Sequence, residues 1–115
     1  MPDESTLICS ADVLSDPGSH GFEVEHRGET LDGFVVLSGG LFYAYRNRCP
    51  HTGAPLDWVE HQFLDLDGSL IQCAVHDARF LIESGECVMG PCPGESLERL
   101  EIVVEGGNIY LAGVP

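Results

Sequence analysis

Apolar and polar residues alternate over short stretches of this chain, and turn residues separate one stretch from the next. Within residues 22–27, Phe22, Val24 and His26 alternate with acidic or basic residues. A period of two is typical of a half-buried β-strand, and no stretch carries the 3.6-residue period of a long amphipathic helix. The pattern therefore predicts an all-β chain in which His26 continues a buried face.

Three pairs of such stretches are joined by two-residue turns. Gly39-Gly40 separates 31–37 from 41–45, Asp67-Gly68 separates 63–66 from 70–73, and Gly106-Gly107 separates 100–104 from 109–111. Glycine adopts positive φ at little steric cost, so these turns predict antiparallel hairpins. The helical candidates are two short capped turns, at 10–14 and at 96–99.

The chain has 115 residues, the length of one ordinary domain. We therefore predict a single domain over 1–115. Residues 46–61 and 74–98 show no long strand pattern, and they predict two functional loops on a β scaffold. The part that carries the chemistry is expected at about 46–93.

Acidic residues dominate the charge of the chain. The chain contains nineteen Asp and Glu residues, five arginines and no lysine, which gives a formal net charge of -14. This charge repels nucleic acid and anionic membrane surfaces, so we expect neither as a partner. Residues 1–20 lack the pattern of an export signal, and no stretch approaches the roughly 18 apolar residues of a membrane span. We therefore expect a cytoplasmic protein.

Two pairs of cysteine and histidine carry the candidate chemistry. One residue separates Cys49 from His51, and two separate Cys73 from His76. Two sulfurs and two imidazoles could hold one tetrahedral zinc ion, which keeps a zinc-stabilised interaction module as an alternative. Zinc pairs usually leave two to four residues between ligands, however. Side chains two positions apart on an extended chain are nearly parallel and about 6.5 Å apart, which favours two neighbouring metal atoms.

The sequence resembles the Rieske family, whose motif of Cys-x-His followed by Cys-x-x-His surrounds a 2Fe-2S cluster. The resemblance covers most of residues 22–112. It implies that Cys49 and Cys73 bind one iron and that His51 and His76 bind the other. The implied fold is a Rieske-like antiparallel β-sandwich with a small cluster-binding subdomain formed by two loops. Gly90-Pro91-Cys92-Pro93 resembles the family's proline loop, which covers the cluster from a third side.

Departures from the family pattern predict the low-potential type. High-potential members resemble this chain but carry an extra cysteine in each loop, where it has Ala54 and Val75. They also carry serine and tyrosine donors where it has Ala78 and Phe80, and Asp77 adds an acidic group. Two imidazoles in place of two thiolates set potentials of roughly -150 to +300 mV. Missing donors and added negative charge favour the low end of that range.

The resemblance implies a Rieske-type ferredoxin, an electron carrier and not an enzyme. It would transfer one electron at a time between a flavin reductase and an oxygenase, redox partners that we expect to present a basic docking face. No nucleophile and base pair, carboxylate dyad or phosphate loop indicates an active site of its own. The alternative within redox proteins is the small Rieske subunit of an assimilatory nitrite reductase.

The remaining cysteines and histidines are predicted to lie outside the site. Five cysteines make an odd count, which fits poorly with a framework of disulfides alone. We predict Cys87 and Cys92 as thiols that fill small apolar spaces, not as a disulfide, and Cys9 as inert. His20 and His61 lack a partner at ligand spacing and are predicted to be solvated.

Overall fold

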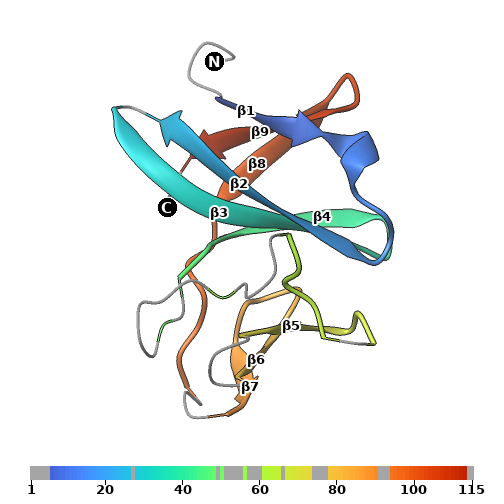
Figure 1. The fold of residues 1–115 in the computed structure, drawn as a ribbon, viewed down its shortest axis with the longest axis vertical. Coiled ribbons are helices and arrows are strands. Elements are labelled where there is room, and N and C mark those ends of the chain that lie inside the picture. The colour runs from blue at the N-terminus through green and yellow to red at the C-terminus, as the bar shows by residue number, and fades with distance from the viewer. Residues whose placement is uncertain are drawn as a thin grey trace.

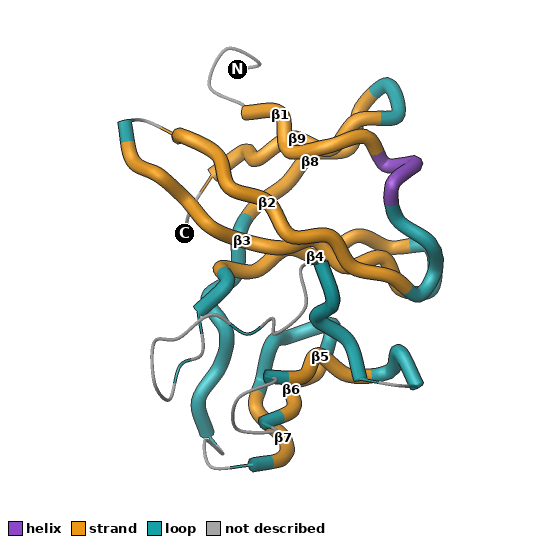
Figure 2. The backbone as a smooth tube through the Cα atoms, in the orientation of Figure 1, coloured by secondary structure: helices purple, strands orange, loops and turns teal. Residues whose placement is uncertain are grey.

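The computed structural model describes residues 6–26, 28–48, 50, 56, 61–65, 67–73, 78–90 and 94–113. In these ranges the chain forms nine strands and one short 3-10 helix (Figure 2), so the all-β prediction is confirmed. The helix, η2 at Ala11–Val13, confirms the capped turn predicted at 10–14. Within the same ranges, no helix has the length and apolar character needed to span a bilayer.

The strands form three antiparallel sheets of three strands each (Figure 1). Sheet A has the order β1-β9-β8, sheet B the order β2-β3-β4, and sheet C the order β5-β6-β7. The bounds are Thr6–Ser10 for β1, Gly18–His26 for β2, Glu29–Ser38 for β3, Leu41–Arg46 for β4, Leu70–Gln72 for β5, Arg79–Leu81 for β6, Cys87–Met89 for β7, Glu101–Glu105 for β8 and Asn108–Gly113 for β9. Sheets A and B form the predicted sandwich, and sheet C is a smaller layer on the other side of sheet B (Figure 1).

Sheet B is the middle layer of the molecule. Its strand β3 buries Phe34 and Val36 in a core shared with sheet C, and buries Val35 in a core shared with sheet A. Successive side chains of a strand point to opposite faces, so a strand covered on both faces carries an unbroken apolar run. The run at 34–36 is such a sequence, and it makes β3 the common wall of both cores.

The turn between β3 and β4 confirms the first predicted hairpin. Gly39 and Gly40 have φ values of 61° and 80°, which glycine adopts without strain. The carboxylate of Asp16 accepts hydrogen bonds from both backbone N–H groups, at 3.0 and 2.8 Å. The hairpin predicted at Gly106-Gly107 is confirmed as well, by β8 and β9.

The helical turn predicted at 96–99 is wrong. The Leu97 N–H donates to the Gly85 carbonyl, and the Leu100 N–H donates to the Ala44 carbonyl, both at 2.9 Å. This stretch is therefore extended and bridges sheets B and C. Pairing with neighbouring strands outweighs the weak local tendency of these residues to form a helix.

Two further predicted boundaries differ from the structure. Residues 74–98, predicted as a loop, contain β6 and β7, whose three residues each are too short to show a period of two. In the described part of 63–66, predicted as a strand, Leu64 forms an isolated bridge with Ile71. The Asp65 carboxylate accepts two backbone N–H groups of the following turn, at 3.1 and 3.3 Å, and this local bonding competes with a regular strand.

Tyr45 ties sheet B to sheet C. Its side chain is fully buried, and its hydroxyl donates a hydrogen bond to the Ile82 carbonyl at 2.6 Å. Beside it, Phe34 stacks on Phe63 with ring centroids 4.2 Å apart. Burial raises the pKa of Tyr45 to about 12, an effect that the nearby Arg99 opposes only in part. Tyr45 therefore stays protonated, as the hydrogen bond requires, throughout the neutral pH range.

Tyr45→Phe should change stability in a way that depends on pH. At pH 7 the variant should lose about 1 kcal/mol of unfolding free energy with the hydrogen bond. The folded pKa lies above the unfolded value near 10, so wild-type stability is complete below pH 10 and is lost as the pH rises toward 12. The variant lacks this group, so its stability should fall less between pH 9 and 11. Urea unfolding at pH 9 and pH 11 measures the free energy of unfolding of both proteins. An equal fall in both proteins between these pH values would contradict the raised pKa of Tyr45.

Candidate metal centre

The first of the two predicted ligand loops is held at both ends. The Asn47 N–H donates to the Asp32 carbonyl at 2.9 Å, which fixes the start of the loop to β3. The Asn47 side chain accepts a hydrogen bond from the Leu56 N–H at 2.7 Å, and Leu56 is itself fully buried. One side chain therefore closes the segment 47–56, which contains Cys49 and His51 in its sequence.

The second loop is closed by its own backbone. The Cys73 N–H donates to the Ala78 carbonyl at 2.8 Å, so the chain leaves β5 and returns to β6 within a few residues. Cys73, Ala78 and Phe80 are all fully buried. The loop thus begins and ends in the core between sheets B and C, with His76 in the sequence between its ends.

A third segment lies against the second loop. Gly90, which follows β7, has a φ of 102°, and a Cβ atom placed on it would lie only 2.7 Å from the Ala78 Cα. Backbone here packs directly on backbone, which explains why the position carries glycine. The start of the predicted proline loop is therefore seated on the end of the second ligand loop.

Of the four predicted ligands, Cys73 lies in the described part, where it is fully buried at the start of its loop. Cys49, His51 and His76 lie outside the described residues. The same holds for other residues singled out in the sequence: Ala54, Val75, Asp77, Pro91, Cys92 and Pro93. The described ranges hold no group of three or more Cys, His, Asp and Glu side chains that could bind a metal ion, and they contain one of the four candidate ligands.

Comparisons with known proteins decide the family of the chain. A family model described as the Rieske [2Fe-2S] domain matches residues 5–106. The chain belongs to this family. Among curated proteins, this Rieske domain is 29% identical over 106 residues to the biphenyl dioxygenase ferredoxin subunit of Pseudomonas sp. strain KKS102, which covers 92% of this chain and 89% of the relative.

Solved structures of similar proteins confirm the fold. The ferredoxin of carbazole 1,9a-dioxygenase from Nocardioides aromaticivorans IC177 superposes with a TM-score of 0.72 at 25% identity, covering 95% of this Rieske domain and 97% of that chain. A chain from a complex of reduced oxygenase and oxidised ferredoxin in carbazole 1,9a-dioxygenase gives a TM-score of 0.73 at 23% identity, covering 97% and 96%. The Rieske-like β-sandwich predicted from the sequence is therefore correct.

These comparisons also confirm the predicted cofactor and role. The cofactor of this Rieske domain is a [2Fe-2S] cluster, and its relatives are ferredoxin subunits, which makes it an electron carrier and not an enzyme. The described residues fit such a group. Leu56, Cys73 and Ala78, at ends of the two predicted ligand loops, belong to one buried core, in which Cys73 places a sulfur atom. Thiolate sulfur is the donor that iron–sulfur clusters require from the protein.

Cys87 of β7 is a second buried cysteine near the loops. Its thiol donates a weak hydrogen bond to the Met89 carbonyl, with sulfur and oxygen 3.4 Å apart, and its side chain belongs to the same core as Cys73. This agrees with the prediction of a thiol in a small apolar space. Cys92, the other member of that prediction, lies outside the described residues. Cys9 is half-buried in β1, and burial raises the pKa of its thiol, which lowers its reactivity.

The prediction that His20 and His61 are solvated is wrong. Both are half-buried, and their rings stack with centroids 4.1 Å apart and planes 6° from parallel. The His61 Nδ1 accepts the Gly21 N–H at 3.0 Å, and the His61 carbonyl accepts the Ser19 hydroxyl at 2.7 Å. Side chain and backbone of His61 thus cover the outer edge of β2, which gives this histidine a structural role. His26 is buried, as predicted.

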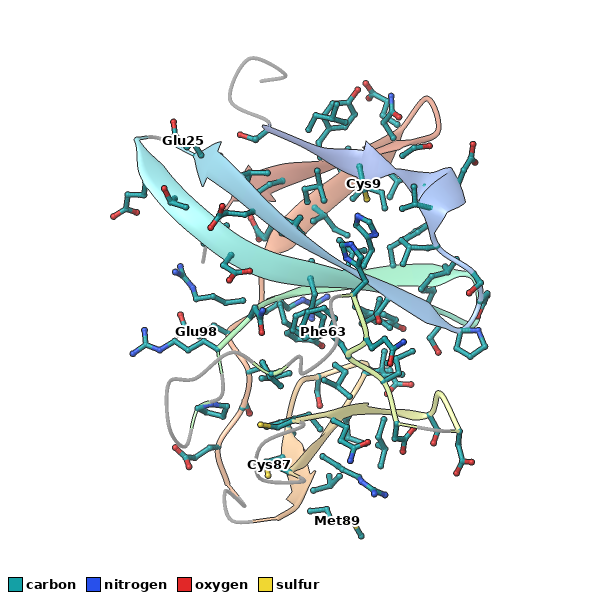
Figure 3. The ribbon with its side chains drawn as sticks, in the orientation of Figure 1. Cys9, Glu25, Phe63, Cys87, Met89 and Glu98 are labelled. Carbon is teal, nitrogen blue, oxygen red and sulfur yellow. The ribbon has the colours of Figure 1, made fainter. Side chains whose placement is uncertain are left out.

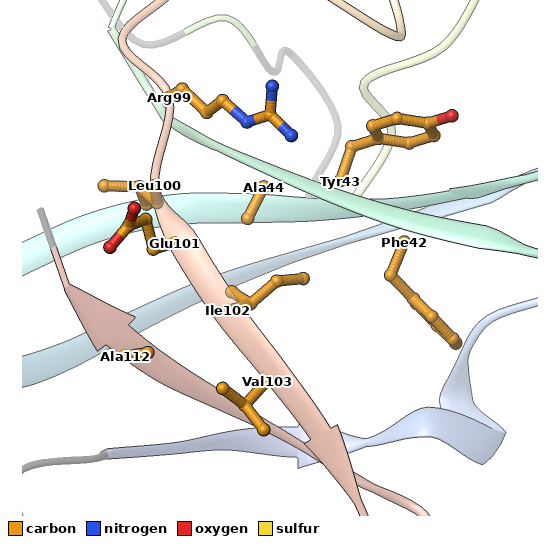
Figure 4. A pocket seen from close by; sticks show the side chains of 9 residues that line it. All are labelled: Phe42, Tyr43, Ala44, Arg99, Leu100, Glu101, Ile102, Val103 and Ala112. Atoms are coloured by element: carbon orange, nitrogen blue, oxygen red, sulfur yellow. The ribbon is translucent and has the colours of Figure 1, made fainter. Parts of the chain in front are cut away.

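A groove of about 560 Å³ opens elsewhere, between the edges of β4 and β8 (Figure 4). Arg99 and Tyr43 lie on one side of β4, and Phe42 and Ile102 lie on the other (Figure 4). None of the nine lining residues is a cysteine or a histidine, the residue types predicted to bind the cluster. The lining also includes none of the described ends of the two predicted ligand loops, Asn47, Leu56, Cys73 and Ala78.

Asn47 is the positioning residue that the sequence analysis missed. Asn47→Ala should leave the Leu56 N–H without its acceptor and should lower the cluster content of the purified protein severalfold. Asn47→Asp keeps the acceptor oxygen, so it should retain most of the cluster and serves as the matched control. Iron and acid-labile sulfide assays measure the content, and equal content in both variants would show that the loop does not depend on this bond.

Proposed function

We propose that Cys49, His51, Cys73 and His76 hold the Rieske cluster. Cys49 and Cys73 would bind one iron, and the two histidines would bind the other. The convergence of the closed loops 47–56 and 73–78 on one buried region supports this assignment, because the four residues are the cysteines and histidines of these loops. When bound, a Rieske cluster takes up and releases one electron at a time.

We propose that residues 1–115 form one domain whose cluster-binding part spans about 46–93. The shared middle sheet supports this, since β3 belongs to the cores on both of its faces. We also propose a low reduction potential. Ala78 and Phe80 are fully buried where high-potential relatives carry hydrogen-bond donors, and neither side chain can donate a hydrogen bond to a reduced cluster.

The function that this site supports best is electron delivery from a flavin reductase to a terminal oxygenase, in the cytoplasm. The observation that carries this is the similarity to the biphenyl dioxygenase ferredoxin subunit, which covers 92% of the chain. A solved relative, a chain from a complex of reduced oxygenase and oxidised ferredoxin, adds support. The net charge of -14 suits partners with a basic docking face, toward which an acidic carrier is steered.

The experiment uses the reductase and oxygenase components of the biphenyl dioxygenase system as probes. With NADH, the reductase should bleach the visible absorption of the oxidised protein, and adding the oxygenase with biphenyl should restore it. Both rates should fall as salt rises, because attraction between charged surfaces is screened. A protein that carries the cluster but exchanges electrons with neither component would contradict the proposal. Co-purification with a large flavin- and haem-containing protein would instead favour the nitrite reductase subunit.

A further inference from the structure

Two consecutive residues of β7 have large apolar side chains that are exposed. Val88 is 48% exposed and Met89 is 54% exposed, whereas their neighbour Cys87 is only 4% exposed. Cys87 already supplies the buried contact of this short strand with the core. Packing in the core therefore does not explain why Val88 and Met89 are apolar. We call these two residues the β7 pair.

The β7 pair lies next to the ligand loops. Met89 is followed by Gly90, whose backbone packs on Ala78, and the Ala78 carbonyl closes the loop that begins at Cys73. Figure 3 places Met89 beyond Cys87 at the end of the molecule farthest from Cys9 of β1. The surface around the exposed pair is therefore close to the second ligand loop. One backbone contact, between Gly90 and Ala78, joins them.

Exposed glutamates lie in the segments next to the β7 pair. Glu86 precedes it on the same chain segment, and Glu95 lies alongside, since its carbonyl accepts the Cys87 N–H at 2.9 Å. Both glutamates are exposed, as is Glu83 in the preceding turn. The cation in the described part of this region is Arg79, which pairs with Met89 across the sheet and is half-buried. The chain segments next to the β7 pair thus carry three exposed glutamates and one half-buried arginine.

We propose that the β7 pair is the apolar contact through which this Rieske domain docks a redox protein with a basic rim around its own electron-transfer site. This docking proposal rests on the proposed function, because it assumes that residues of the nearby loops bind the cluster. The charge supports the choice of partner, since exposed glutamates near the pair, in a chain of net charge -14, attract a basic surface. Flexible methionine adapts to different apolar surfaces, which suits a carrier that must meet a donor and an acceptor in turn.

A matched control comes from β8. Val103 and Val104 are 44% and 45% exposed, close to the values of the β7 pair, but they lie in sheet A on the far side of the middle sheet. Val88→Thr/Met89→Gln replaces the β7 pair by polar side chains of similar size. Val103→Thr/Val104→Thr does the same to the control pair. Both double variants keep side chains of similar size. A difference in electron-transfer rate between them therefore reports on the location of the replaced pair.

The probe is cytochrome c, a small basic redox protein with lysines around its exposed haem edge. In a stopped-flow experiment, the reduced Rieske domain loses one electron and the ferric haem gains it. Hexacyanoferrate(III), a small oxidant that needs no apolar contact, gives a second rate for each protein. The ratio of the cytochrome c rate to the hexacyanoferrate(III) rate removes effects of a changed potential, and it is the quantity compared.

We expect the ratio to fall about tenfold in Val88→Thr/Met89→Gln, in line with the loss of two apolar contacts at an interface centre. It should stay within twofold of wild type in Val103→Thr/Val104→Thr. An unchanged ratio in the first variant, or an equal fall in both, would overturn the docking proposal. Wild-type protein without iron would refute the proposed ligand site instead, so the two failures are distinguishable.

Discussion

Replacing Cys73 by alanine is expected to abolish cluster assembly and to leave the β fold in place. Cys73 is fully buried at the first residue of its closed loop, and alanine offers iron no donor atom at this position. The change removes one sulfur atom from a core of apolar residues, which should lower the unfolding free energy of the metal-free protein by on the order of 1 kcal/mol. Iron, acid-labile sulfide and the visible spectrum measure the cluster, and circular dichroism measures the fold.

Cys87→Ala is the matched control for this prediction. Cys87 is 4% exposed and lies in the same core, so its loss leaves a comparable cavity. This variant should keep the cluster and its spectrum with a similar small loss of stability. A coloured, iron-containing Cys73→Ala protein, or equal loss of iron in both variants, would show that the buried sulfur of Cys73 is not the ligand.

Gly90→Ala should have the second large effect. The added Cβ would lie 2.7 Å from the Ala78 Cα, and the φ of 102° is one that alanine rarely adopts. Backbone cannot yield as a flexible side chain can, so the end of β7 should move away from the second ligand loop. We expect a loss of about 2 kcal/mol of unfolding free energy and an increase of at least tenfold in the rate at which an iron chelator bleaches the protein.

Gly94→Ala separates the effect of the close backbone contact from the effect of the positive φ. Gly94 also has a positive φ, of 88°, but a Cβ atom at this position meets nothing within 4 Å. The variant should lose about 1 kcal/mol through backbone strain alone and should release iron at the wild-type rate. If both variants bleach equally fast, the contact between Gly90 and Ala78 has no part in protecting the cluster.

The hairpins of the sandwich could be predicted because their information is local. Gly39-Gly40 and Gly106-Gly107 have the positive φ values that two-residue turns require, and period-two stretches flank them. Residues 31–37, predicted as one arm of a hairpin, lie in β3. Such features depend on residues that are neighbours in sequence. The place of β3 as the middle strand of its sheet was not predicted.

What the sequence did not reveal depends on contacts between distant segments. The stretch 96–99 is extended because Leu97 pairs with Gly85 and Leu100 pairs with Ala44, partners that no local pattern announces. The same is true of His61, which binds the edge of β2 through Gly21.

For the site, the spacing of Cys49, His51, Cys73 and His76 was enough to indicate the family, because two separated pairs of this kind rarely occur together. The spacing did not indicate how the loops are held. Asparagine at the start of a turn, as at Asn47, often bonds to backbone further along the chain, and this signal could have found the clasp with Leu56.

The measurement that tests the central claim most directly is pulsed electron paramagnetic resonance on dithionite-reduced protein whose histidines carry nitrogen-15. The ligand assignment predicts a rhombic signal from a reduced 2Fe-2S cluster with hyperfine coupling to two directly bound histidine nitrogens. A 2Fe-2S signal without histidine coupling would contradict the two-imidazole ligand set. A protein that contains zinc and gives no signal would contradict the electron carrier itself.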